Sequence, residues 1–488
     1  KLPDPTNGGR VHLVASATAL DGELTNFTVN GQEAMNLPQD NPDFTFFDWA
    51  RVSFNTTTKM IWVSFHSRNV DWLDKSNAAL QISATDAHGN CVKGEWTVAR
   101  LPVTITWATP KTNDWADSPW LVHVHNFGNA SATIQSLALD GTRVATSPTL
   151  PLAIPANQHV VLGVISPLAK ARGDIFVLQA ATNFGQIGLG GRTPDTRFPI
   201  EVWPRSSDCP VPSANKTNWD ALASHGIDTI FFNGYDASKC GGLSLRDIVH
   251  TDGANGTKFW LTQEAMALVD PADYGAVSAL FIADEDDGHL DAALRQKSAT
   301  TATLQSQYPN INIYQGGKTN RYDGAYAGIA DIQGVDVYVA GCAPVILEAL
   351  HPVPILASFA YNRNARNNQM PLASMTYSEL YAGNYMPNGN EIALQIGAVA
   401  AAGAKGLTMF QSIQEEIDKD ASDWNGVVKD TLLSIAVELV RDTLRLGDVQ
   451  SAIIHNSDGG DPLTDAPSLV EVVRSDTHIL VVAVNTKA

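Results

Sequence analysis

A dense run of carboxylates follows an apolar segment near the middle of the chain. The sequence ALFIADEDDG, residues 279–288, places Asp284 and Glu285 directly after a strand-like run. Crowded carboxylates repel one another, so at least one is expected to hold its proton more readily than it would in water. The general acid of glycosidic bond cleavage requires this property. Strand alternation puts Phe281, Ala283 and Glu285 on one face, which makes Glu285 the leading acid/base candidate. A helix N-cap, a calcium loop and a solvated acidic turn are competing explanations.

Hydrolysis also needs a second carboxylate, and the separation of the pair decides between retention and inversion. Glu264, in FWLTQEA, closes the preceding strand, although a loop carboxylate facing solvent is the simpler explanation. Asp336, in GVDVY, either takes part in catalysis or forms hydrogen bonds inside the fold. Glu415 and Glu416 are the remaining candidates, so the identity of the second carboxylate stays open.

Several aromatic and amide side chains are placed where they could contact a sugar. Sugars present C–H faces that stack on aromatic rings, and their hydroxyl groups need polar partners. Side chains of these types close several expected strands or lie in the long connection 360–390, and long loops often shape substrate sites. For each aromatic residue, packing at the rim is the alternative. The candidates are Trp203, Asn233, Tyr235, Gln315, Tyr338, Tyr361 and Gln411.

These residues need a scaffold that gathers strand ends, and the second half of the chain predicts one. From residue 200 onward, short apolar runs alternate with helical stretches. The expected strands are 200–203, 229–233, 258–262, 279–283, 311–315, 335–339, 354–359 and 406–411. Eight strands, each followed by a helix, over roughly 250 residues predict a TIM (β/α)8 barrel. A doubly wound open sheet is the alternative, but no Gly-rich phosphate turn follows the first strand.

Three segments resemble retaining glycoside hydrolase barrels. FIADEDD resembles their fourth-strand segment, IADIQGVDVYVAG their sixth, and IALQIGAVAAAGAKGLTMFQSI their seventh helix and eighth strand. The resemblance implies a carbohydrate partner and catalysis by carboxylates without a cofactor. Such enzymes usually place the nucleophile at the end of strand seven, whereas the expected seventh strand, PILASFAYNRN, ends without Asp or Glu.

The first 200 residues predict antiparallel β-sandwiches, because short alternating runs are separated by turn residues. The part beginning LVHVHNFGNASATIQSLALDGTRV resembles the immunoglobulin-like modules of secreted carbohydrate enzymes. Within it, His123 and His125 are expected on a solvated strand face, and no third metal ligand suggests itself. The predicted fold class is thus multi-domain: a β-sandwich (1–107), an immunoglobulin-like sandwich (108–197), a barrel (198–448), and C-terminal strands (449–488) packed on the barrel or a sandwich.

Composition narrows the partners and the compartment. The net charge is −19 and no Lys/Arg cluster stands out, which argues against nucleic acid and anionic lipid. No apolar run approaches the about 20 residues of a membrane span. A first residue other than Met and five Asn-x-Ser/Thr sequons predict a secreted, extracellular glycoprotein. The sequons are at Asn26, Asn55, Asn129, Asn215 and Asn255.

The four cysteines predict one disulfide at most with any geometric support. Cys209 and Cys240 follow the first two barrel strands, whose loops lie on the same face, so a bond between them is reasonable. Cys91 and Cys342 are left unassigned, and no Cys or His spacing matches a metal site.

Together these features favour a secreted glycoside hydrolase acting on an extracellular polysaccharide or glycan. The alternative is a non-catalytic structural or lectin-like glycoprotein, such as a self-assembling coat or filament component. The acidic run at strand four favours the enzyme, and the missing strand-seven carboxylate favours the alternative.

Overall fold

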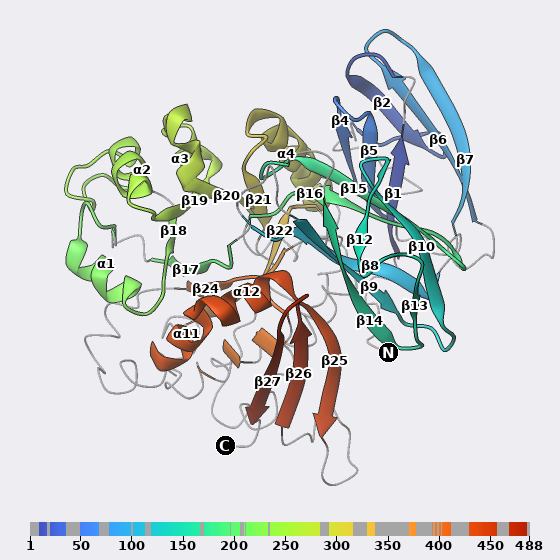
Figure 1. Cartoon of the computed structure of the whole chain (residues 1–488). Helices are drawn as coiled ribbons and strands as arrows, with labels where there is room; N and C mark the ends of the chain where they lie inside the picture. The colour runs from blue at the N-terminus through green and yellow to red at the C-terminus, as the bar shows by residue number, and fades with distance from the viewer. Residues whose placement is uncertain are drawn as a thin grey trace.

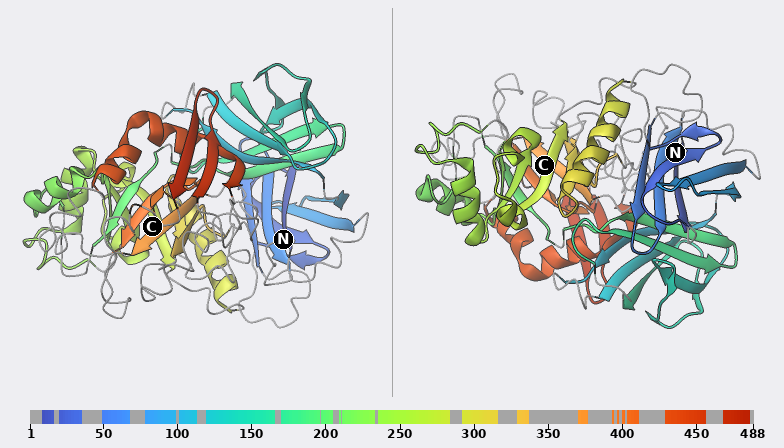
Figure 2. Two further views of the ribbon diagram at one scale, coloured as in Figure 1. Left: turned by 90° about the horizontal axis from the view of Figure 1, so that it is seen from below. Right: turned by 90° about the horizontal axis from the view of Figure 1, so that it is seen from above.

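The chain folds into two antiparallel sandwiches, a parallel barrel and a C-terminal sheet (Figure 1). Seen from above and below, both sandwiches lie on one side of the barrel (Figure 2). The computed structural model describes residues 9–16, 20–35, 49–67, 78–98, 101–112, 119–165, 170–195, 197–204, 209, 211–232, 235–283, 292–315, 329–336, 370–376, 393, 396–397, 400–401, 403–410, 429–455 and 468–485.

The first sandwich consists of two antiparallel sheets. One has the order β1 (Gly9–Ser16), β5 (Met60–Ser67), β4 (Trp49–Asn55). The other has the order β3 (Gln32–Glu33), β2 (Leu24–Val29), β6 (Ala78–Asp86), β7 (Cys91–Val98). Alternate side chains such as Phe27, Val29 and Leu80 are buried between the sheets, as the period of two predicts.

The second sandwich begins at β8 (Val103–Pro110), which spans the expected boundary between residues 107 and 108. Its first sheet has the order β12 (Thr146–Ser147), β14 (Gln158–Ile165), β9 (Pro119–Asn126), β8. Its second has the order β11 (Thr142–Arg143), β10 (Ala132–Leu139), β15 (Ile175–Thr182), β16 (Gly185–Arg192), with β13 (Leu152–Ile154) also beside β10.

The expected barrel of eight parallel strands is present, and it is closed. Its strands are β17 (Ile200–Trp203), β18 (Thr229–Phe232), β19 (Lys258–Thr262), β20 (Val277–Ala283), β21 (Asn312–Gln315), β22 (Ile332–Asp336), β23 (Met370–Thr376) and β24 (Leu407–Phe410). Pairing of β24 with β17 closes the ring, which excludes the open-sheet alternative.

Six barrel strands lie within two residues of their predicted bounds, and the other two differ by more. The sixth strand is 332–336 rather than 335–339, and the seventh is 370–376 rather than 354–359, a segment outside the described residues. For the seventh strand the reason is visible in the sequence. PILASFA and MPLASMT are both short apolar runs with Pro and Ala-Ser at similar places. Periodicity alone cannot choose between two such runs.

Helices cover the outside of the barrel where the structure describes them. They are α1 (Lys216–Ala223), α2 (Leu245–Ala254), α3 (Gln263–Met266), the 3-10 helix η2 (Pro271–Ala276), α4 (Ala292–Gln307), α11 (Lys429–Ala436) and α12 (Glu438–Leu446). The sequence predicts a single helix over 424–445, but the extended ψ of 124° at Val437 separates α11 from α12. None of the described helices is long and apolar enough to span a bilayer.

The C-terminal strands form a sheet of their own. β25 (Asp448–His455), β26 (Ser468–Arg474) and β27 (Ile479–Asn485) pair in that order, and residues 475–478 form the turn between the last two strands. Val449 and Val473 are buried in the same apolar cluster as the outward residues of the barrel strands. The sheet therefore packs on the barrel, as one of the two expected arrangements has it.

A buried ion cluster joins both sandwiches to the barrel. Asp331, just before β22, accepts from Arg51 of β4 and from Arg192 of β16, each at 2.6 Å. Its Oδ2 also accepts from the Ile313 backbone N–H at 2.9 Å. All three charged side chains are at most 6% exposed, so these bonds are formed away from water.

Trp107 makes a second connection between the second sandwich and the barrel. A β-bulge lies between Ile105 and Trp107, and bulges redirect side chains. Ile105 stays in the sandwich core, whereas Trp107 joins the aromatic cluster of the barrel interior. The ammonium of Lys405, which precedes β24, lies 5.2 Å from its ring centroid.

Candidate functional site

The carboxyl end of the barrel is where the ends of all eight strands meet. In such barrels this end carries the functional residues, because eight loops converge there on a rigid ring. The strands end, in order, at Trp203, Phe232, Thr262, Ala283, Gln315, Asp336, Thr376 and Phe410.

A layer of aromatic rings fills the barrel interior below this end. Trp203 packs edge-to-face on Phe231 and Phe281, with centroids 4.3 and 5.4 Å away. Trp260 and Tyr314 continue the layer, 4.8 Å apart. Only 7% of Trp203 and 8% of Phe281 is exposed, so the rings close the interior. Any ligand site at this end must lie above this layer, and the sugar-contact role predicted for Trp203 is limited to that small exposed fraction.

Gly334 makes room for this layer. A Cβ at this position would lie 2.3 Å from the Tyr314 hydroxyl oxygen and 2.8 Å from its ring. Any side chain at residue 334 would therefore displace Tyr314. The glycine of the GVD segment was visible in the sequence, but its partner was not.

Glu201 is a buried carboxyl group that is not among the predicted site residues. Its neighbours Ile200 and Val202 face the outer apolar cluster, so alternation puts Glu201 on the inner side of β17. It is 1% exposed, and Thr408 Oγ1 donates to its Oε2 at 2.7 Å. Burial raises the pKa of Glu201 well above its usual value, which favours the protonated, neutral form of the group. Only the interior position of β17, not the residue type, could have revealed it.

The predicted catalytic carboxylates have different outcomes. Glu264 lies exposed in the first turn of α3, where Thr262 caps the helix, which matches the solvent-facing explanation. Asp336 is the last residue of β22. Glu285 and Asp284 lie outside the described residues, as do Glu415 and Glu416; β20 ends at Ala283, immediately before the acidic run.

Among the predicted sugar-contacting residues, Tyr235 has a structural explanation. It is half-buried, its hydroxyl donates to Leu243 O, and its ring meets that of Phe232 edge-on at 6.2 Å. These contacts are the rim packing anticipated as the alternative. Gln315 is the last residue of β21, while Asn233, Tyr338, Tyr361 and Gln411 lie outside the described residues.

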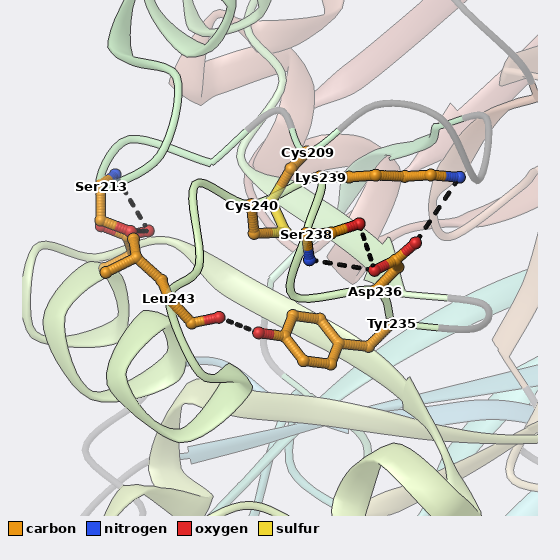
Figure 3. Close-up of a disulfide and its surroundings, with 9 residues drawn as sticks. Cys209, Ser213, Tyr235, Asp236, Ser238, Lys239, Cys240 and Leu243 are labelled. Carbon is orange, nitrogen blue, oxygen red and sulfur yellow. Dashed lines mark hydrogen bonds and ion pairs between the residues drawn. A yellow bond between two sulfur atoms is a disulfide. The ribbon is translucent and has the colours of Figure 1, made fainter.

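The expected disulfide between Cys209 and Cys240 is present (Figure 3). It links the connection after β17 to the connection after β18, and both cysteines are at most 5% exposed. In the same loop Asp236 accepts from the Ser238 backbone N–H at 2.9 Å and from its hydroxyl at 2.7 Å. The bond therefore crosslinks two neighbouring loops at the carboxyl end of the barrel. Cys91 is free and exposed, and Cys342 lies outside the described residues.

The sequons differ in exposure. Asn129 and Asn255 are exposed, in a bend and at the end of α2 respectively. Asn26, Asn55 and Asn215 are half-buried. The Asn55 side chain accepts from the Thr57 and Thr58 backbone N–H groups, and Asn215 caps α1, so both are already engaged.

His123 contradicts its prediction as part of a solvated face. It is fully buried, since the end of α12 covers this side of β9, and its Nε2 lies 2.7 Å from Leu446 O. Leu446 lies 323 residues from His123 in the sequence, so no local sequence pattern could predict that it covers this histidine. Within the described ranges, no group of three or more His, Cys, Asp or Glu residues is placed to hold a metal ion.

Comparisons with known proteins give only distant similarities. No protein-family model matches the chain, and no curated protein matches it. Among solved structures it is similar to a GH2 beta-galacturonidase from Eisenbergiella tayi (13% identity, 87% of this chain, 96% of that chain, TM-score 0.36). It is also similar to a beta-D-glucuronidase of Dictyoglomus thermophilum (11% identity, 89% of this chain, 88% of that chain, TM-score 0.35). A third similar structure is a beta-glucuronidase of an uncultured Clostridium sp. (9% identity, 82% of this chain, 80% of that chain, TM-score 0.34). At these scores the similarities assign the chain to no family.

Proposed function

We propose that the protein is a glycoside hydrolase that acts on an extracellular polysaccharide or glycan above the aromatic layer of the barrel. One observation carries this proposal. The fourth strand of a closed barrel, β20, contributes Phe281 to the layer and ends at Ala283, directly before four consecutive carboxylates.

The chemistry follows from this order of residues. Rings near the strand end offer an apolar surface for the C–H face of a sugar. A carboxyl group beside apolar rings and other carboxylates keeps its proton at higher pH, as a general acid must. We assign that role to Glu285, with Asp284 as its neighbour.

The observed seventh strand changes the search for the second carboxylate. β23 ends at Thr376, and the first carboxylate after it in the sequence is Glu379. The glycosidases that this chain resembles place the nucleophile at the end of strand seven. We therefore propose Glu379 as nucleophile or base, in preference to the exposed Glu264 or to Asp336.

Secretion and glycosylation belong to the same proposal. The Cys209–Cys240 disulfide is typical of an oxidising compartment. The exposed sequons at Asn129 and Asn255 would be accessible to a glycosylating enzyme.

A non-catalytic, lectin-like or structural protein is the second candidate. The filled barrel interior favours it, because the aromatic layer can pack the interior of the barrel without contacting a substrate. Such a protein would bind glycan, or assemble with its own copies, without turnover.

A glycan panel separates the two candidates. We expect the full chain to release reducing ends from at least one polysaccharide or aryl glycoside, and Glu285→Gln to lose at least about 100-fold. Glu379→Gln should lose as much, whereas the exposed Glu264→Gln serves as the matched control and keeps full activity. Binding without turnover by the wild type would establish the second candidate, and full activity of Glu285→Gln would remove that residue from the mechanism.

A further inference from the structure

The last turn of α12 is the point where the barrel, the second sandwich and the C-terminal sheet meet. The final carbonyls of a helix have no partner within it. At this turn Lys405 Nζ donates to Leu444 O, at 2.7 Å, and to Gly447 O. Leu446 O receives its hydrogen bond from His123, on β9 of the second sandwich. The sandwich is thus attached to the helix end by a histidine.

The same turn also donates hydrogen bonds to the second sandwich. Arg445 donates to Lys111 O at 2.8 Å and to Pro110 O at 3.2 Å, at the end of β8. Arginine stays charged at every pH of interest. The histidine bond is therefore the part of this attachment that can respond to acid.

The hydrogen bonds of His123 require it to be neutral. Leu446 O can only accept, so His123 Nε2 carries the proton and its Nδ1 has a free lone pair. That Nδ1 lies 3.0 Å from His159 Nε2 on β14, which must therefore donate to it. The two rings are stacked with centroids 5.1 Å apart, and His159 is 4% exposed. Both tautomers are determined by one backbone carbonyl.

Added protons disrupt this arrangement in two steps. One proton puts a charge where water cannot reach it, and a second makes two N–H groups face each other. The charged and titratable groups around the pair are His125 on β9, Lys405 before β24, Asp448 on β25 and Arg474 on β26. Asp448 favours a positive charge, while burial and the two cations oppose it. Burial, with His159 as neighbour, lowers the pKa of His123 to about 3, and burial lowers that of His159 to about 4.

We propose that the His123–His159 pair is an acid-sensitive latch, which holds the second sandwich on the end of α12 at neutral pH and releases it in acid. Opening the junction exposes both rings to water, where a histidine titrates near pH 6.5. The closed state therefore has its full stability above that pH, and its stability relative to the open state decreases as the pH falls toward 4. At pH 5 each histidine makes the open state about 30-fold more populated than at neutral pH, given the lowered values above.

Amide hydrogen exchange on the full chain tests the latch. Peptides covering Leu444–Val449 and β9 are compared at pH 7.5 and pH 5.0, after correction for the intrinsic exchange rates. The wild type should open several hundredfold more at pH 5.0, whereas in His123→Gln/His159→Gln the pH ratio should fall below about 3-fold. His250→Gln, at an exposed histidine of α2, is the control and should keep the wild-type ratio.

Two results would overturn the latch: no increase in junction opening at pH 5.0 in the wild type, or the full increase retained in the double variant. If the double variant opens at both pH values, titration of the wild-type histidine Cε1–H resonances decides. Two buried histidine signals that do not titrate above pH 5 support the latch. Titration of all histidines near pH 6.5 in the folded protein refutes it.

Discussion

Removing the charge of Asp331 should loosen three parts of the molecule at once. Asp331→Asn keeps the shape of the side chain but leaves Arg51 and Arg192 buried without their carboxylate, while one amide oxygen can still accept from Ile313 N–H. Loss of one partner from a buried pair costs about 3–5 kcal/mol, because the remaining charge stays away from water. With two guanidinium groups on one carboxylate, we expect the upper end, about 5 kcal/mol.

That loss is large compared with the total stability of a folded domain, about 5–15 kcal/mol. Urea unfolding followed by tryptophan fluorescence should show a lower midpoint, and limited proteolysis should cut between sandwich and barrel sooner. The matched control is Asp220→Asn, which removes a carboxylate from an exposed pair with Lys216 at 2.7 Å. An exposed pair contributes under about 1 kcal/mol. The reasoning is refuted if Asp331→Asn shifts the midpoint no more than Asp220→Asn does.

Three further predictions concern the other contacts. Trp107→Ala removes the ring that joins sandwich to barrel and should lower the free energy of unfolding in urea by about 3–5 kcal/mol. Trp96→Ala, at a ring that is 43% exposed, should lower it clearly less. Equal losses would contradict the bridging role of Trp107. Cys209→Ser/Cys240→Ser opens a loop with a sequence separation of 31 and should lower stability by about 4 kcal/mol; an unchanged melting curve would mean that the crosslink constrains little. When the chain is expressed through a secretory pathway, Asn129→Gln and Asn255→Gln should each lower the mass of the protein by one glycan. Asn55→Gln should leave the glycan mass unchanged. A glycan on Asn55 would show that its hydrogen bonds to residues 57 and 58 do not protect it.

Elements with a strong local signal were predictable from the sequence. β17 and β19 have the expected boundaries, because each is a short apolar run enclosed by turn residues. The disulfide followed from barrel geometry once the first two strands were recognised. The order of strands likewise pointed to the carboxyl end of the barrel as the place of the candidate site.

Features that depend on distant contacts were not predictable. His123 looks like an exposed strand residue until the end of α12 covers it. Trp107 changes sides through a bulge, and the pKa of Glu201 is raised only because β17 is inside a closed ring, where Glu201 is buried. The misplaced seventh strand had the greatest consequence, since it hid Glu379 as a candidate.

The dependence of the Glu285→Gln loss on the leaving group tests the glycosidase account most directly. A general acid matters most when the leaving group is a poor one. We predict at least about a 100-fold loss of kcat/KM on an unactivated glycoside and a much smaller loss on its dinitrophenyl counterpart. Equal losses on both substrates, or no loss on either, would contradict the assignment of Glu285 as the acid at the end of the fourth strand.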